Sequence, residues 1–307
     1  MAHPLHRVSA SGRTFDILNY LFLALFALSI LYPFWTMVID SLSTPAVVRG
    51  LGLHLWNDEW SFQAWNYVAR QNDVGRAYLN TLHRVIFGTL ATLFVTFTAS
   101  YALSKRNLPG RTVITFMFVF TMFFNGGLIP TYLLVRNLGL INSRWVLVIV
   151  PALGVFYIII TRNFIMTIDQ AMEDSAVIDG ANYWTIMFRI IVPLSKPVLA
   201  TVALWTAVAH WNFWFDALIY INERPKRILQ LLLRDVIDRI TTFNEDNSMQ
   251  RLIHELCQTG ACPEWATIPH ESIVAATVLV TIGPIVIFYP FVQKYFVKGA
   301  MLGSLKG

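Results

Sequence analysis

Charged residues are scarce in this chain. Among its 307 residues only 13% are Asp, Glu, Lys or Arg, whereas 56% are hydrophobic and 14% are aromatic. An average soluble domain carries about 25% charged residues, so the composition excludes an ordinary soluble protein and indicates a membrane protein.

Motifs for nucleotide binding and hydrolysis are also missing. The chain has no G-x-x-x-x-G-K-[ST] phosphate loop, so it cannot hold ATP in the usual way. It has no H-E-x-x-H or G-x-S-x-G motif, which leaves an integral-membrane enzyme, such as a glycan-processing transferase or a protease, as the less favoured alternative. The net charge of +5 comes from basic residues scattered through loops, and this scatter argues against nucleic acid as a partner.

Six long stretches carry no charge. They cover residues 17–39, 85–104, 112–135, 145–161, 197–215 and 272–293. A helix needs ~20 residues to cross the hydrocarbon layer, and the absence of alternating polar residues favours helices over barrel strands. The first stretch is too long for a removed signal peptide. We therefore predict an all-α integral membrane protein with six transmembrane helices.

The basic residues near the ends of the chain indicate its orientation. Arg7 and Arg13 precede the first stretch, and the short loop 105–111 carries three positive charges, so both should be cytoplasmic. Six crossings then return the C-terminus to the cytoplasm. The loop 223–271 should lie outside, and its apolar pattern at 228–237 predicts a helix along the membrane or against a partner subunit.

An island of charge separates the fourth and fifth stretches, over residues 173–197. Asp169 is a candidate N-cap for a short helix over about residues 170 to 178, and Gly180 can take the left-handed conformation that closes a helix. A second short helix is predicted from Asn182 to about Ile191. On spacing alone, an ordinary polar loop between membrane helices explains the island equally well.

The residues of this island resemble a known motif. The EAA loop of ABC-importer permeases is similar at Glu173, Ala176, Asp179, Gly180, Ala181, Phe188, Ile191, Pro193 and Pro197. In that family the loop forms a coupling helix that docks into a groove on a cytoplasmic ATPase. The resemblance therefore implies ATPase-coupling residues, which here are Glu173, Asp174, Ser175, Ala176, Asp179, Gly180 and Ala181. Asp174 and Ser175 replace the two alanines that usually follow the glutamate.

Further phrases resemble carbohydrate permeases related to the maltose system. The tail 296–307 carries this resemblance, and residues 78–82 resemble the start of the permease core of the ABC-importer family. Within the maltose-related group, residues 126–140, 210–222 and the tail most resemble the oligosaccharide permeases often found beside polysaccharide-degrading enzymes. The resemblance implies a type I ABC-importer permease fold with the coupling helix between spans four and five. It also implies three parts, namely an N-terminal segment with the first span and an external loop (1–76), a permease core (77–296) and a cytoplasmic tail (297–307).

The same resemblance implies a function. The chain would be the permease subunit of an ATP-driven importer in a bacterial inner membrane, which translocates oligosaccharides delivered by an external solute-binding protein. Its partners would be a homologous second permease and a cytoplasmic ATPase dimer that holds ATP and Mg²⁺, while this chain itself would bind no cofactor and no metal. Positively charged external loops suit acidic oligosaccharides such as oligouronates. A permease for amino acids or polyamines is the alternative within transport.

Four residues are candidates for the substrate path. Asn125 begins the phrase Asn-Gly-Gly-Leu-Ile-Pro, where a kink is expected. Trp211, Asn212 and Trp214 offer aromatic faces and an amide to a sugar, although an interfacial aromatic belt is the alternative. Asp216 lies 20 residues after Lys196, which is ~30 Å along a helix, and is therefore expected at the outer interface.

Cys257 and Cys262 are the only two cysteines. With His254 and His270 they form the spacing H-x2-C-x4-C-x7-H, which is not a familiar zinc pattern. Because the loop that contains them is expected outside, where thiols are not kept reduced, the pair is a candidate disulfide.

Overall fold

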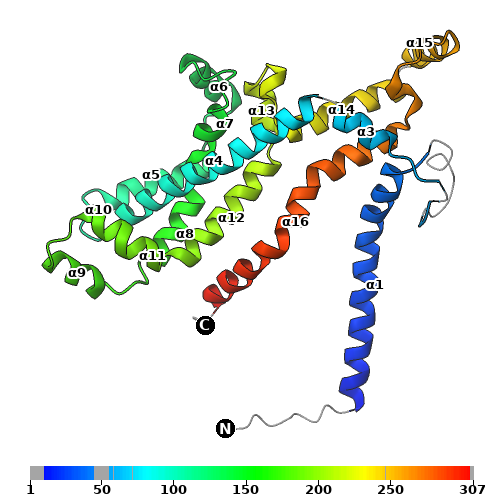
Figure 1. Cartoon of the computed structure of the whole chain (residues 1–307). Helices are drawn as coiled ribbons and strands as arrows, with labels where there is room; N and C mark the ends of the chain where they lie inside the picture. The colour runs from blue at the N-terminus through cyan, green and yellow to red at the C-terminus, as the bar shows by residue number, and fades with distance from the viewer. Residues whose placement is uncertain (1–9, 45–54, 58, 71, 246, 305–307) are drawn as a thin grey trace. The chain divides into compact units, whose positions relative to one another are not determined.

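The structure is a computed structural model that describes residues 10–44, 55–57, 59–70, 72–245 and 247–304 (Figure 1). Within these ranges every named element is a helix, and the one isolated bridge pairs Ser43 with Trp60. The predicted all-α class is confirmed. The first nine residues and the last three of the predicted cytoplasmic tail lie outside the described ranges.

The chain forms two compact units, each assembled from two separate stretches. The first unit comprises Met1–Arg70 and Val236–Val280, and the second comprises Gln71–Asp235 and Thr281–Gly307. The first unit contains α1 (Ala10–Ser41), α3 (Gln63–Arg70), α15 (Asn247–Gln258) and η4 (Glu264–Thr267). Helices α14 (Leu229–Glu245) and α16 (His270–Ser304) contribute residues to both units.

The second unit holds all the coupling and path candidates. In chain order its helices are α4 (Asn72–Ser104), α5 (Arg111–Phe123), α6 (Leu128–Asn137), α7 (Val146–Ile149), η1 (Val150–Ala152), α8 (Val155–Ile165), α9 (Ala171–Ile178), α10 (Tyr183–Ile186), the π-helical turn η2 (Met187–Ile191), α11 (Val192–Leu194), α12 (Lys196–Asn212), α13 (Phe215–Tyr220) and η3 (Arg224–Lys226). It is therefore built from one long helix and many shorter ones.

Three helices in the described ranges are long and apolar enough to cross a membrane alone. They are Gly12–Ser41, Asp73–Ser104 and His270–Ile287. Three further candidates are bent pairs, namely Arg111–Phe123 with Leu128–Asn137, Val146–Ala152 with Val155–Ile165, and Tyr183–Leu194 with Lys196–Asn212. If each pair is one span the count is six, which agrees with the six charge-free stretches.

The bends are sharper than the sequence predicted. Between α5 and α6 the chain turns through 114°, so the expected kink is a complete break of the helix. Gly127 has a φ of 84°, and the side chain of Asn125 accepts a hydrogen bond from its N–H at 2.8 Å. Helix α6 starts at Leu128, and Pro130 is tolerated in its first turn because N–H groups there have no partner within the helix.

Helix α4 begins 13 residues earlier than the charge-free stretch that starts at residue 85. It packs mainly against α12 and α8 through small and polar side chains four residues apart, which share one face. These buried residues are Gly88, Thr92, Thr96 and Ser100. The Ser100 hydroxyl donates a hydrogen bond to the Ile158 carbonyl at 2.8 Å, which joins α4 to α8.

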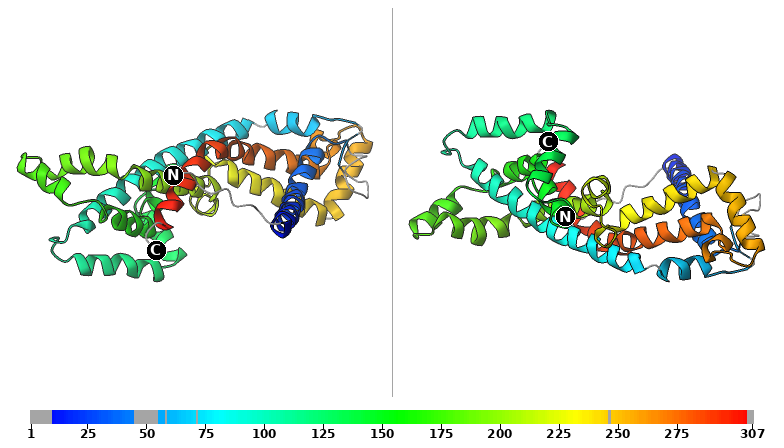
Figure 2. Two further views of the ribbon diagram at one scale, coloured as in Figure 1. Left: turned by 90° about the horizontal axis from the view of Figure 1, so that it is seen from below. Right: turned by 90° about the horizontal axis from the view of Figure 1, so that it is seen from above.

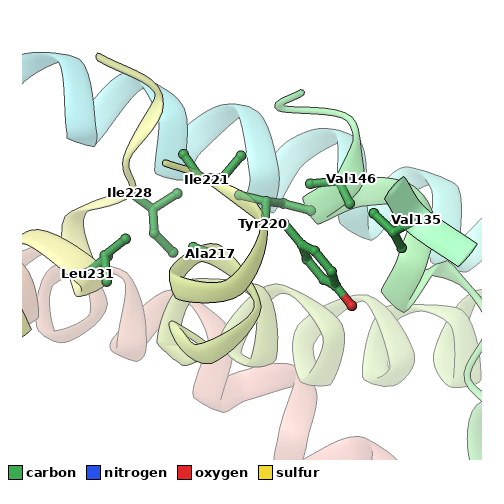
Figure 3. Close-up of a cluster of buried hydrophobic side chains, with 8 residues drawn as sticks. Val135, Val146, Ala217, Tyr220, Ile221, Ile228 and Leu231 are labelled. Carbon is green, nitrogen blue, oxygen red and sulfur yellow. The ribbon is translucent and has the colours of Figure 1, made fainter. Parts of the chain in front are cut away.

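A buried apolar cluster joins the ends of the broken spans (Figure 3). It contains Val135, Val146, Leu147, Ala217, Tyr220, Ile221, Ile228 and Leu231. These residues come from α6, α7, α13, the following segment and α14, so the cluster fixes α13 against α6 and α7.

Candidate functional site

The coupling loop begins with helix α9, which lies at one end of the second unit (Figures 1 and 2). The carboxylate of Asp169 accepts a hydrogen bond from the Ala171 N–H at 3.0 Å. It satisfies one of the four N–H groups that the first turn leaves unpaired, as the sequence predicted. The helix starts at Ala171, one residue later than expected.

Gly180 closes α9. Its φ is 79°, and its N–H donates to the Val177 carbonyl at 3.0 Å. The Ala181 N–H donates to the Ala176 carbonyl at 2.9 Å, which completes a Schellman motif. Since L-residues with a Cβ reach this conformation only at a cost, the prediction that Gly180 ends the helix is confirmed.

The second helix of the loop begins after Asn182. The side chain of Asn182 accepts a hydrogen bond from the Thr185 N–H at 2.8 Å and so caps α10. Helical structure then continues through the π-helical turn η2 and α11 to Leu194, three residues beyond the predicted end at Ile191. The chain bends by 80° before α12, at Ser195 between two prolines.

One face of the loop is anchored to the rest of the unit. Ala176, Ile186, Met187 and Ile191 are buried in a cluster with Phe97 and Tyr101 of α4 and Ile165 of α8. An ion pair between Lys105 and Glu173 adds a polar link, and the Lys105 ammonium lies 4.2 Å from the centre of the Tyr101 ring. Movement of α9 is therefore linked directly to the end of α4.

Several apolar side chains of the loop are exposed, which the sequence did not predict. We call them the docking face, which comprises Met172, Val177, Ile178, Tyr183 and Trp184. Ile178 is 86% exposed although it lies in an ordered helix. The sequence signal for these exposed side chains was the presence of apolar residues within a segment that is otherwise rich in charge. Exposed apolar patches are typical of surfaces that contact a protein or a membrane.

The predicted coupling residues divide between the two faces of the loop. Asp174, Ser175 and Asp179 are exposed. Glu173 is half-buried in its ion pair, and Ala176 is buried under the helix. The carboxylates of Asp174 and Asp179 thus lie on the outer surface of the loop, whereas Ala176 packs inward with larger apolar residues.

The four path candidates also divide. Asn125 and Asn212 are exposed and Trp214 is half-buried. Trp211, in contrast, is only 6% exposed and its ring packs edge-on against Tyr78 at 6.1 Å between centroids. This burial fits a packing role for Trp211 better than contact with a sugar.

The structure gives Asp216 a buried partner that the sequence did not predict. Its carboxylate pairs with Arg84 of α4 at 2.6 Å, and Arg84 is 1% exposed. Asp216 lies in α13, the short helix that follows α12. The signal in the sequence was Arg84, directly before the apolar stretch 85–104, where a charge at the boundary of a membrane span is also expected.

Two more polar residues of α4 hold the segment that follows α13. The Asn80 side-chain amide donates to the Pro225 and Arg227 carbonyls at 2.9 and 2.8 Å. The Thr81 hydroxyl accepts from the Leu229 N–H at 2.9 Å. Backbone groups of an irregular segment are thereby satisfied by buried side chains, as burial requires.

In the first unit, Cys257 and Cys262 are joined by a disulfide. The bond spans the end of α15, where Gly260 has a φ of 81° and the Ala261 N–H donates to the Leu256 carbonyl at 3.0 Å. Among the described residues there is no group of three His, Cys, Asp or Glu that could hold a metal ion.

Comparison with known proteins finds one family and several relatives. A family model described as "binding-protein-dependent transport system inner membrane component" matches residues 108–300. The polygalacturonan/rhamnogalacturonan transport system permease protein YtcP of Bacillus subtilis (strain 168) is 37% identical over 296 residues, which cover 96% of this chain and 99% of that protein. Protein LplC of the same organism is 37% identical over 307 residues, with 99% of both chains covered.

A solved structure agrees with these relatives. One chain in the crystal structure of a bacterial ABC transporter involved in the import of the acidic polysaccharide alginate superposes with a TM-score of 0.82. It is 34% identical in sequence, and the match covers 96% of this chain and 100% of that one.

Proposed function

This chain belongs to the binding-protein-dependent transport system inner membrane components, and we propose that it translocates acidic oligosaccharides as one of two permease subunits. It is a permease of a carbohydrate ABC importer with the type I permease fold, and not an enzyme. The observation that supports the proposed mechanism is the coupling loop, which is anchored by buried side chains and exposes the apolar side chains of the docking face.

The partners follow from the family. An ABC importer of this type works with ATPase subunits and a solute-binding protein. In our proposal the ATPases hold ATP and Mg²⁺, and a homologous second permease completes the pathway. The docking face enters a groove of an ATPase subunit, which requires the loop and both chain termini to be cytoplasmic.

In this proposal the movement passes through the coupling loop in successive steps. When the ATPases close, the docking face moves with them and shifts α9. The buried side of the loop and the pair between Lys105 and Glu173 pass this shift to α4 and α8. The bent spans then rearrange, and the cavity changes from inward-facing to outward-facing, ready for sugar from the binding protein.

The substrate class is supported by side chains near the break in span five. Asn212 can hydrogen-bond sugar hydroxyls, and Asn125 offers a second amide on the break in span three. The guanidinium carbon of Arg234 lies 4.1 Å from the centre of the Trp214 ring. An aromatic ring beside a positive charge suits a sugar ring that carries a carboxylate.

The test is uptake by the complete transporter in liposomes, supplied with its ATPases and its solute-binding protein. We expect ATP-driven uptake of labelled trigalacturonate, with little uptake of the neutral maltotriose. Uptake of maltotriose alone would remove the acidic part of the proposal. Uptake of an amino acid or polyamine in place of both sugars would overturn the carbohydrate function.

A further inference from the structure

Span five is interrupted beside two of the path candidates. Helix α12 ends at Asn212 and α13 starts at Phe215, with Phe213 extended between them at a ψ of 121°. A helix end leaves carbonyl groups without partners inside the helix. Arg84 supplies a partner, because its Nη1 donates to the Phe213 carbonyl at 2.5 Å.

The same guanidinium also holds the other side of the break. Its Nη2 donates to Oδ2 of Asp216 at 2.6 Å, and Oδ1 of Asp216 accepts from the Ala217 N–H at 2.8 Å in the first turn of α13. One side chain of α4 is therefore bonded to the end of α12 and, through Asp216, to the start of α13. The pair is largely buried, since the two side chains are 1% and 11% exposed.

We propose that Arg84 is a positioning residue that fixes the break in span five, so that Asn212 and Trp214 are held in place for the sugar. The identity of the sugar rests on the proposed function, whereas the geometry of the break does not. Asp216 is the second half of this device, which we call the Arg84 clip.

General stability is a poor explanation for the clip. Taking two charges out of water costs free energy that their attraction only partly returns, and well-packed apolar residues often serve a fold equally well. The guanidinium instead fixes the relative position of two acceptors, because its planar group donates hydrogen bonds to both at fixed angles. A lysine at the same place keeps the positive charge, but its ammonium group is a compact point charge without a fixed donor geometry. It therefore cannot hold both sides of the break in one arrangement.

The variants Arg84→Lys and Asp216→Asn test the clip. The first preserves the charge and the second preserves the shape of the side chain. The control is Glu223→Gln, which makes the same acid-to-amide change in the exposed pair between Glu223 and Lys226, 2.9 Å apart. All are compared as complete transporters in lipid nanodiscs, where amide hydrogen exchange is followed by mass spectrometry and basal ATPase activity is recorded.

For both variants we expect amides of α13 to exchange about tenfold faster, while those of α9 stay unchanged. In liposomes the KM for trigalacturonate uptake should rise about tenfold, with maximal rate and basal ATPase activity close to wild type. The Glu223→Gln control should match the wild type in every measurement.

Other results would contradict the clip or the proposed substrate class. Unchanged exchange in α13 for both variants would show that the clip does not hold the break. Faster exchange throughout the second unit, or a fall in maximal rate with KM constant, would make the pair a general stabiliser and overturn the positioning role. If wild type itself fails to take up trigalacturonate, the proposed substrate class fails, and the exchange data alone then decide on the clip.

Discussion

Lys105, directly after α4, forms an ion pair with Glu173 in the first turn of the coupling helix α9. The two side chains are 29% and 18% exposed, so water still screens the pair. An exposed pair is worth at most about 1 kcal/mol of folding free energy. Its loss should therefore affect the transmission of movement more than the folding of the chain.

Charge reversal tests this link. Glu173→Lys places two ammonium groups together and puts a positive charge at the positive end of the α9 dipole, a local penalty of ~0.3–1 kcal/mol. We expect the permease to insert but to lose most of the ATPase stimulation caused by loaded binding protein. The double variant Lys105→Glu with Glu173→Lys should recover part of it. A double variant no better than Glu173→Lys alone would show that Glu173 acts without Lys105.

Gly180→Val should uncouple the transporter. A side chain at a φ of 79° costs ~1 kcal/mol or more, so the Schellman end of α9 would distort while the membrane helices still insert. The matched control is Gly75→Val, because Gly75 has no positive φ and an added Cβ there meets nothing within 4 Å. Stimulated ATPase activity and uptake are measured together. Normal coupling in Gly180→Val would refute our placement of the coupling element.

Gly88→Ala should destabilise the contact between α4 and α12. A Cβ at Gly88 would lie 2.6 Å from the ring of His210, and such overpacking costs about 1–3 kcal/mol. The melting temperature of the purified protein should fall, whereas Gly283→Ala, with open space around the new Cβ, should not lower it. Adding His210→Ala should remove the effect of Gly88→Ala. If it does not, the strain arises from another neighbour.

Trp211 and Trp214 should respond differently to alanine. Trp211 is buried, so Trp211→Ala should lower the free energy of unfolding by about 3–5 kcal/mol. The amount of folded permease should fall as a result. Trp214→Ala should leave expression near wild type and reduce trigalacturonate uptake. Uptake per folded molecule separates the two effects. Equal uptake by the wild type and Trp214→Ala would exclude Trp214 from the sugar path.

Cys257 and Cys262 should be found bonded in protein isolated from membranes without reductant. Peptide mass spectrometry would show the two cysteines linked, as in the structure. Because the closed loop is short, its removal in a Cys257→Ser, Cys262→Ser double variant should change stability by only about 2 kcal/mol or less. Complete alkylation of both thiols before reduction would contradict the bond and the external location of this loop.

Local features of the coupling loop were predictable because each depends on neighbours in the sequence. The Asp169 and Asn182 caps and the positive φ of Gly180 follow from the chemistry of single residues beside a helix end. The count of six spans follows from apolar length in the same way. The docking face was missed because exposure depends on which side of α9 packs against α4 and α8.

The buried pair of Arg84 and Asp216 could not be read from local patterns. The two residues are 132 positions apart in the sequence, and each alone resembles a charge at the edge of a span. Treating Arg84 as such an edge also shortened the predicted helix by 13 residues. The sizes of the bends were missed for a related reason, since Gly and Pro permit a break while the packing around them sets its angle.

Helix α4 has no proline, and the neighbouring spans of its unit are broken into bent pairs. From Arg84 to Ser104 it rises ~30 Å at 1.5 Å per residue, with the Arg84 clip at one end and Lys105 at the other. In our proposal it serves as a rigid strut beside the bent spans. Distances within α4 should then stay constant through the transport cycle, so that a displacement at the proposed ATPase side is passed to the proposed sugar side.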